Sequence, residues 1–128
     1  MTLDSSVLVA ILFGESGYLE LVDRVLEADE VRISAPTLVE ASLVLAGRRK
    51  SRSAGEVDAL VQELGATVVP FGEGEGRAAV AAFLRYGRGR HKAALNFGDC
   101  LAYAAASVAG DSLLFVGDDF RKTDIKPA

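Results

Sequence analysis

Short apolar segments typical of β-strands alternate along this chain with longer segments that have helical periodicity. The strand candidates are residues 1–4, 31–34, 66–70 and 112–116, and a pair of predicted helices separates each from the next. Parallel strands need crossover connections of this length, whereas antiparallel neighbours can be joined by tight turns. The alternation therefore predicts an α/β fold in which a mostly parallel sheet is flanked by helices on both faces.

The predicted helices carry apolar stripes that we expect to face the core. They cover residues 5–13, 18–28, 37–46, 53–64, 76–86 and 99–109. In the second of them the stripe includes Leu19 and Leu26, and in the fifth it includes Val80 and Phe83. The glycine-rich residues 72–76 match no complete phosphate-binding motif, and we interpret them as a loop that leads into a helix.

One domain spanning residues 1–128 is predicted from length and composition. Half of the residues are apolar (50%), and a chain of 128 residues can bury a core without disulfides or a structural metal. Cys100 is the only cysteine, which excludes an intramolecular disulfide and favours the reducing cytoplasm. The longest uncharged run, residues 100–110, is far shorter than the roughly 20 residues that cross a bilayer, so we expect no membrane partner.

The net charge of −4 hides an uneven distribution. Residues 1–47 hold eight acids and two bases, whereas residues 48–92 hold nine bases and five acids. The bases of the middle segment include two clusters that suit a phosphate backbone, although such clusters are also common on solvated surfaces. The candidates for contacts with a nucleic-acid backbone are Arg48, Arg49, Arg52, Arg88, Arg90 and Lys92.

Carboxylates from distant parts of the chain map to one edge of the predicted sheet. They are Asp4 at the end of the first strand, Glu40 after the second, Asp99 at the start of the last long helix, and Asp118 and Asp119 after the last strand. The carboxyl ends of parallel strands meet at one edge, where such sheets bind ligands. Like charges gathered there repel one another unless a hard cation such as Mg²⁺ or Mn²⁺ binds through oxygen ligands.

Purely structural interpretations compete with this one. Asp4 and Asp99 each stand where a helix N-cap is expected, and the Gly-Asp-Asp at residues 117–119 is typical of a turn. Glu40 is the only charge in a helix that is otherwise almost entirely apolar. An unpaired buried carboxylate costs several kcal/mol unless its pKa rises or it finds a partner, so Glu40 favours a functional site.

An ordered set of motifs gives the sequence a resemblance to a known family. The opening MTLDSSVLVAIL is followed by RGRHKAALNFGDC at residues 88–100, LFVGDDF at 114–120 and TDI at 123–125. In these motifs the chain resembles the PIN-domain ribonucleases, and more closely the VapC toxins of bacterial VapBC toxin–antitoxin pairs. The resemblance spans essentially the whole chain and implies a three-layer PIN-like domain with a mostly parallel sheet flanked by helices.

The resemblance also implies roles for individual residues. The implied catalytic set is Asp4, Glu40, Asp99, Asp118 and Asp119, with Ser6 as the small polar residue beside it. Asp4 and Asp99 are the implied direct metal ligands. Asp118 and Asp119 both fit the fourth acidic position, and we favour Asp119 because it immediately precedes the phenylalanine of the motif.

The function implied by the resemblance is that of the toxin component of a VapBC pair. Such a toxin is an endoribonuclease that depends on Mg²⁺ or Mn²⁺ and cleaves RNA phosphodiester bonds with a metal-activated water. The implied partners are RNA, a VapB-like antitoxin that inserts a C-terminal segment near the active site, and a second copy in a homodimer. Two alternatives stay open: a catalytically inactive PIN-like protein-interaction module, and a phosphoacceptor domain, which requires a lysine that is absent after the last strand until Lys122.

Overall fold

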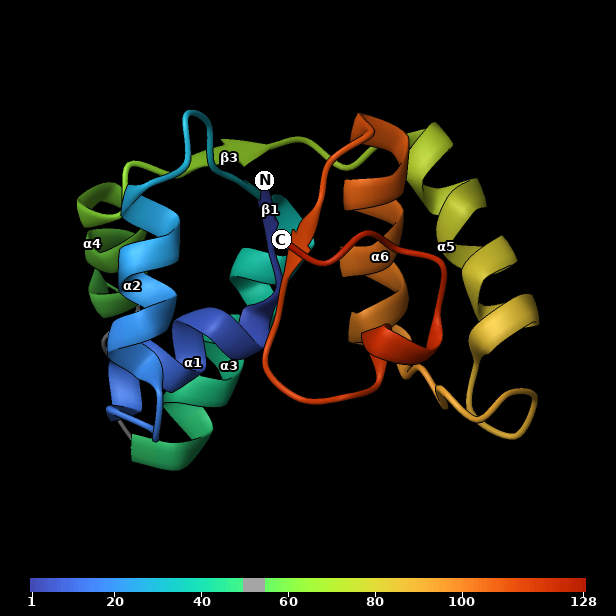
Figure 1. The fold of residues 1–128 in the computed structure, drawn as a ribbon, viewed down its shortest axis with the longest axis horizontal. Helices are drawn as coiled ribbons and strands as arrows, with labels where there is room; N and C mark the ends of the chain where they lie inside the picture. The colour runs from blue at the N-terminus through green and yellow to red at the C-terminus, as the bar shows by residue number, and fades with distance from the viewer. Residues whose placement is uncertain (50–54) are drawn as a thin grey trace.

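Four short parallel strands form the sheet at the centre of the fold. A computed structural model describes residues 1–49 and 55–128 of the chain (Figure 1). The strands are β1 (Thr2–Leu3), β2 (Arg32–Ser34), β3 (Thr67–Val69) and β4 (Leu113–Leu114), in the spatial order β3-β2-β1-β4. β1 pairs in parallel with β2 and β4, and β2 pairs in parallel with β3. The predicted parallel sheet is confirmed, with strands shorter than the apolar segments suggested.

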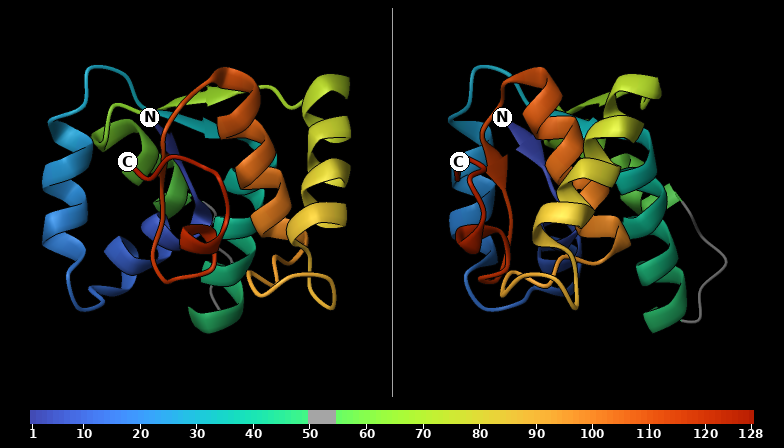
Figure 2. Two further views of the ribbon diagram at one scale, coloured as in Figure 1. Left: turned by 45° about the vertical axis from the view of Figure 1, so that its right-hand side comes forward. Right: turned by 90° about the vertical axis from the view of Figure 1, so that its right-hand side faces the viewer.

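Helices cover both faces of this sheet (Figures 1 and 2). They are α1 (Ser5–Phe13), α2 (Tyr18–Leu26), α3 (Ala35–Arg49), α4 (Gly55–Glu63), α5 (Glu73–Tyr86) and α6 (Phe97–Ala109), with a 3-10 turn at Phe120–Lys122. Leu114 packs into a core with α1 to α4, and the adjacent Leu113 packs into a second core with α5 and α6. The fold therefore has three layers. No helix in the described part of the chain is long and apolar enough to cross a membrane.

Two of the predicted apolar stripes are wrong at several positions. In α2 the fully buried residue is Val25, whereas Leu19 and Leu26 are both 63% exposed. In α5 the buried face is formed by small residues and Tyr86, and Val80 is 62% exposed and Phe83 40%. The reason in α5 is that α5 packs against the alanine-rich face of α6, and small side chains on both helices allow a close approach.

The glycine-rich residues 72–76 are also not the loop that we predicted. α5 begins at Glu73, three residues before the predicted start. The Gly72 amide donates a hydrogen bond to Glu75 Oε2 at 2.9 Å, which caps the first turn. Glycines in the first turn are tolerated because this cap and the acidic side chains near the helix N-terminus stabilise it.

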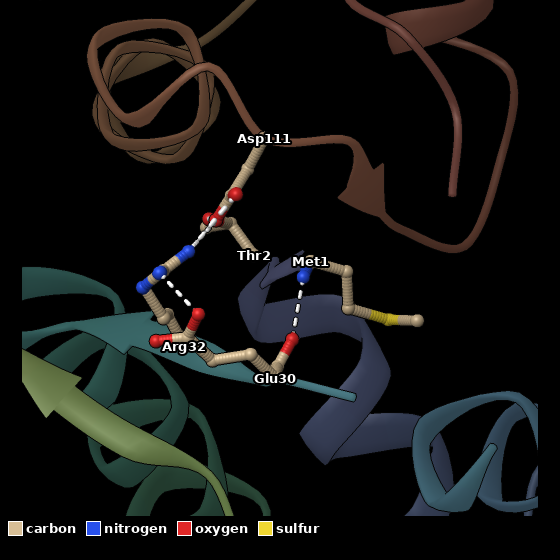
Figure 3. A network of polar contacts seen from close by, with 5 residues as sticks. All are labelled: Met1, Thr2, Glu30, Arg32 and Asp111. Atoms are coloured by element: carbon tan, nitrogen blue, oxygen red, sulfur yellow. Dashed lines mark hydrogen bonds and ion pairs between the residues drawn. The ribbon is translucent and has the colours of Figure 1, made fainter. Parts of the chain in front are cut away.

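A polar network holds the amino edge of the sheet, at the ends of the strands opposite the carboxylates (Figure 3). Arg32 Nη1 donates to both carboxylate oxygens of Asp111, at 2.9 and 2.8 Å, and Arg32 also pairs with Glu30 at 2.6 Å. The Thr2 hydroxyl donates to Asp111 Oδ2 at 2.9 Å, and the Met1 amino group donates to the Glu30 carbonyl at 2.6 Å. The network therefore connects the starts of β1, β2 and β4.

Replacing Asp111 by asparagine should destabilise this edge and change the pH dependence of folding. Burial alone would raise the pKa of Asp111, but the hydrogen bonds from Arg32 and Thr2 outweigh it and lower the pKa below 3.8. A lowered carboxyl pKa stabilises the fold above about pH 4, and this stabilisation is lost as the pH falls through the folded-state pKa. We expect Asp111→Asn to lower the free energy of unfolding at pH 7 by roughly 1–2 kcal/mol.

Urea unfolding at pH 7 and pH 3 measures this effect, with Asp23→Asn as the matched control because Asp23 is exposed on α2. The difference between wild type and Asp111→Asn should shrink at pH 3. An unchanged difference at both pH values would contradict the assigned role of the Asp111 charge.

Candidate active site

Asp4 is a buried carboxylate at the carboxyl end of β1, only 4% exposed. Its amide donates to the Leu114 carbonyl at 2.9 Å, which fixes it beside β4. Its Oδ2 accepts hydrogen bonds from the amide (3.0 Å) and the hydroxyl (2.5 Å) of Ser6, so Asp4 also caps α1. The Ser6 hydroxyl oxygen in turn accepts from the Val116 amide at 3.0 Å. Ser6 thus ties the orientation of Asp4 to the segment that follows β4.

The environment of Asp4 disfavours its ionised form. Burial raises the pKa of Asp4 to about 6, and the hydrogen bonds from Ser6 oppose this rise. The negative charges of Asp99 and Glu40 raise the pKa of Asp4 further. The three carboxylates therefore lie close enough to repel one another.

Glu40 lies on α3, near Asp4 and Asp99, and is half-buried. Its carboxylate lies against Gly98, so that a side chain at position 98 would overlap it. Burial raises the pKa of Glu40, the Ser5 hydroxyl opposes this rise, and the charge of Asp99 adds to it. The apolar surroundings of Glu40 in the sequence correctly indicated a carboxylate with a perturbed pKa.

Asp99 lies in the first turn of α6, but it does not cap that helix. α6 begins at Phe97, and the Asn96 side chain accepts from the Asp99 amide at 2.9 Å. The Asp99 carboxylate accepts from the Asn96 amide at 2.8 Å, which completes a reciprocal capping box. Burial raises the pKa of Asp99, the Asn96 amide opposes the rise, the charge of Asp119 adds to it, and Arg88 lowers it.

Asp118 and Asp119 follow β4 and lie at the exposed rim of the carboxylate cluster, which consists of Asp4, Glu40 and Asp99. The Asp118 side chain is 82% exposed and pairs with Arg121 at 3.5 Å, and the Asp119 side chain is 60% exposed and pairs with Lys122 at 3.9 Å. Of the two, Asp119 is the one whose charge raises the pKa of Asp99. Burial therefore fixes the orientation of neither side chain.

The donor set suits a hard divalent cation. Asp4, Glu40 and Asp99 offer carboxylate oxygens, the ligands that Mg²⁺ and Mn²⁺ prefer, and a dication would offset their mutual repulsion. Within residues 1–49 and 55–128, no three His, Cys, Asp or Glu side chains are already gathered as a metal-binding group.

Comparison with known proteins identifies the family. The family model described as "PIN domain" matches residues 1–126. The chain belongs to the PIN-domain family. Ribonuclease VapC36 of Mycobacterium tuberculosis is 42% identical over 127 residues, covering 98% of this chain and 91% of the relative. Ribonuclease VapC42 of the same species is 41% identical over 129 residues, covering 100% of this chain and 98% of the relative. Within the PIN domains, the chain is therefore a member of the VapC family, as the sequence motifs indicated.

Solved structures of other proteins share this PIN-domain fold. VapC20 of Mycobacterium tuberculosis, described as a toxin that cleaves the sarcin-ricin loop, has a TM-score of 0.79 at 17% identity, covering 99% of this chain and 97% of that one. A chain of a toxin–antitoxin complex from Klebsiella pneumoniae has a TM-score of 0.70 at 16% identity, covering 96% and 92%. At these identities the likeness concerns the fold, and it confirms the predicted three-layer architecture.

A basic loop precedes α6 in this PIN domain. Arg88, Arg90 and Lys92 are all exposed on it. The loop is anchored by a bridge between Gly87 and Leu95, and the Arg88 amide donates to the Leu95 carbonyl at 3.0 Å. Because Arg88 lowers the pKa of the adjacent Asp99, its positive charge acts directly on the carboxylate cluster.

The second basic cluster is already engaged in contacts within the chain. Arg48 pairs with Glu15 at 3.0 Å, Arg49 pairs with Glu56, and both guanidinium groups stack over Phe13 at 5.0 and 5.1 Å. These contacts explain the conformation of Arg48 and Arg49 without a ligand. Arg52, the remaining candidate of this cluster, lies outside the described residues.

Two residues of this PIN-domain site were missed by the sequence interpretation. Asn96 is the actual cap of α6, and the Asn-x-x-Asp spacing of a capping box was the signal that could have found it. Gly98 forms the surface on which Glu40 rests, and no local pattern could have indicated a contact between residues so far apart in the sequence.

Proposed function

We propose that this chain is the toxin component of a VapBC pair and an endoribonuclease that hydrolyses RNA phosphodiester bonds. The observation that carries the proposal is the convergence of Asp4, Glu40 and Asp99 from three separate elements, where the charges of Glu40 and Asp99 raise the pKa of Asp4 and the charge of Asp99 raises the pKa of Glu40. The relatives at about 40% identity are named ribonucleases, which supports catalysis over an inactive PIN-like interaction module.

The proposed cofactor is Mg²⁺, with Mn²⁺ as a substitute, and Asp4 and Asp99 would hold it. When bound, such an ion lowers the pKa of a coordinated water and offsets negative charge on a phosphate. Ser6 keeps the Asp4 carboxylate in one orientation through its two hydrogen bonds. The first turn of α6 does the same for Asp99 through Asn96.

Glu40 is the residue that we assign to proton handling. A half-buried carboxylate with a raised pKa can accept a proton from an attacking water at its carboxylate oxygen. Asp119, whose charge raises the pKa of Asp99, would orient that water, and Asp118 is the alternative residue for this role. In-line attack then releases the 3′-oxygen and leaves a 5′-phosphate, with no protein nucleophile.

Arg88, Arg90 and Lys92 are proposed to hold the RNA backbone beside the cluster. We expect Arg88→Gln to weaken RNA binding and to make the plot of log K against log salt less steep by roughly 0.7, since one phosphate contact is lost. The matched control is Arg77→Gln, because Arg77 is 79% exposed and pairs with Glu73 on α5. Both substitutions are made in an Asp99→Asn background, in which the RNA stays uncleaved. Binding titrations at several salt concentrations then measure the slope for each protein. Equal slopes with and without Arg88→Gln in the Asp99→Asn background would contradict the assignment.

A VapB-like antitoxin is the proposed protein partner, in keeping with the toxin–antitoxin complex that shares this fold. We place the toxin and its antitoxin in the cytoplasm, which contains the RNA substrate and keeps the buried free thiol of Cys100 reduced. Expression of the chain with and without the antitoxin, followed by sequencing of RNA 5′ ends, tests the function. An inactive interaction module would give identical RNA ends in cells expressing wild type and Asp4→Ala.

The homodimer stays a prediction, and an exposed apolar surface supports it. Phe97 is 80% exposed and stands between two shallow hollows on α3, α5 and α6. These hollows are lined by Val39, Leu43, Val80, Phe83 and Leu101. Apolar patches of this kind mark interaction sites, and a projecting side chain beside hollows suits a two-fold interface in which each copy inserts its Phe97 into the other. Equilibrium sedimentation of the purified chain measures the oligomeric state.

A further inference from the structure

The Glu40 carboxylate occupies the space that a side chain at position 98 would fill, and Gly98 has no side chain. A Cβ atom built on Gly98 would lie 2.5 Å from Glu40 Cδ and 2.6 Å from Glu40 Oε2, far inside van der Waals contact. Gly98 is the second residue of α6 and directly precedes Asp99. The Glu40 carboxylate therefore rests on the first turn of the same helix that presents Asp99.

Backbone conformation does not explain this glycine. Gly98 is not among the glycines with a positive φ, so an L side chain fits its backbone. Alanine is a better helix former than glycine, and the cap of α6 is supplied by Asn96 rather than by position 98. What the glycine provides here is an open surface for a partner side chain.

We propose that Gly98 is a positioning residue, which keeps the Glu40 carboxylate beside Asp99 in the proposed active site. A side chain at position 98 would leave α6 in place, because the capping box and the packing against α5 hold that helix. The end of the flexible Glu40 side chain would move instead. The partial positive charge at the N-terminus of α6 also favours a carboxylate in this location. The inference rests on the proposed role of Glu40 in catalysis.

The direct test is Gly98→Ala. We expect RNA cleavage to fall on the order of 10–100-fold, and the affinity for Mn²⁺, measured by electron paramagnetic resonance, to fall in the same range. The melting temperature should stay the same or rise, because alanine favours the helix. Gly74→Ala is the matched control, since Gly74 is likewise the second residue of its helix, α5, and a Cβ there meets nothing within 4 Å.

Combining the substitution with changes at Glu40 separates this inference from the proposed function. In a Glu40→Ala background, Gly98→Ala should have no further effect on cleavage or on Mn²⁺ affinity. Glu40→Asp, which is shorter by one methylene group, should recover part of the activity in the Gly98→Ala background. Full activity and full Mn²⁺ affinity of Gly98→Ala, or an equal loss in the Glu40→Ala background, would overturn the positioning role. Full activity of Glu40→Ala would instead overturn the catalytic assignment of Glu40 itself.

Discussion

Asp99→Asn is expected to reduce RNA cleavage by on the order of 10³-fold while leaving the protein folded. Asparagine keeps the shape of the side chain, and its amide oxygen can accept the hydrogen bond from the Asn96 amide that closes the capping box. It removes one negative charge from the cluster in which a divalent cation would bind. Loss of several kcal/mol of electrostatic stabilisation corresponds to this drop in rate.

Single-turnover cleavage of a defined RNA by wild type and Asp99→Asn measures the effect. Asp58→Asn is the control, because Asp58 is exposed on α4 on the other side of the sheet. Circular dichroism and melting temperature establish that both variants are folded. Unchanged Mg²⁺-dependent cleavage by Asp99→Asn would show that the site is assigned to the wrong residue.

Divalent cations are expected to raise the melting temperature of the wild-type protein. Burial raises the pKa of Asp4 to about 6, and the negative charges of Asp99 and Glu40 contribute to this rise. A cation that binds the folded state and not the unfolded chain stabilises the fold by about 2.7 kcal/mol when its concentration is 100 times its Kd. Thermal melts with Mg²⁺ or Mn²⁺, compared with melts in a chelator, measure the shift.

Asp4→Asn should abolish this metal-dependent shift. In the absence of metal the variant should melt no lower than wild type, since it removes a buried charge and its amide oxygen can still accept from the Ser6 amide. The Asp58→Asn control should keep the full shift. A metal shift of equal size in Asp4→Asn would place the bound ion elsewhere on the protein.

The sequence predicted the parallel sheet and the converging carboxylates because both depend on order along the chain. Strands that alternate with helices leave few topologies, and residues that follow parallel strands meet at one edge. Asp4 and Glu40 could therefore be expected at the same edge of the sheet, and their assignment to a catalytic site stays a prediction. Periodicity and the flanking glycines also placed the ends of the helices to within a few residues, apart from the predicted start of the fourth helix at residue 53, which lies outside the described residues.

The features that the sequence could not predict depend on which element or residue lies against a given helix or side chain. Periodicity finds the apolar positions of α5, but it does not reveal that α6 offers an alanine-rich surface, so Phe83 was wrongly expected in the core. Asn96 and Asp99 both suit an N-cap, and the Asn-x-x-Asp spacing that favours Asn96 was overlooked. The pairing of Arg48 with Glu15 joins residues on α3 and beyond α1, and no local signal indicates it.

The most direct test of the central claim is cleavage of a labelled RNA by the purified chain, free of antitoxin, with Mg²⁺ or with a chelator. If Asp4, Glu40 and Asp99 form a metal-dependent nuclease site, wild type will cleave only when the ion is present and will leave 5′-phosphate ends, and Asp4→Asn will not cleave. Equal cleavage in the chelator, or full cleavage by Asp4→Asn, would contradict the account.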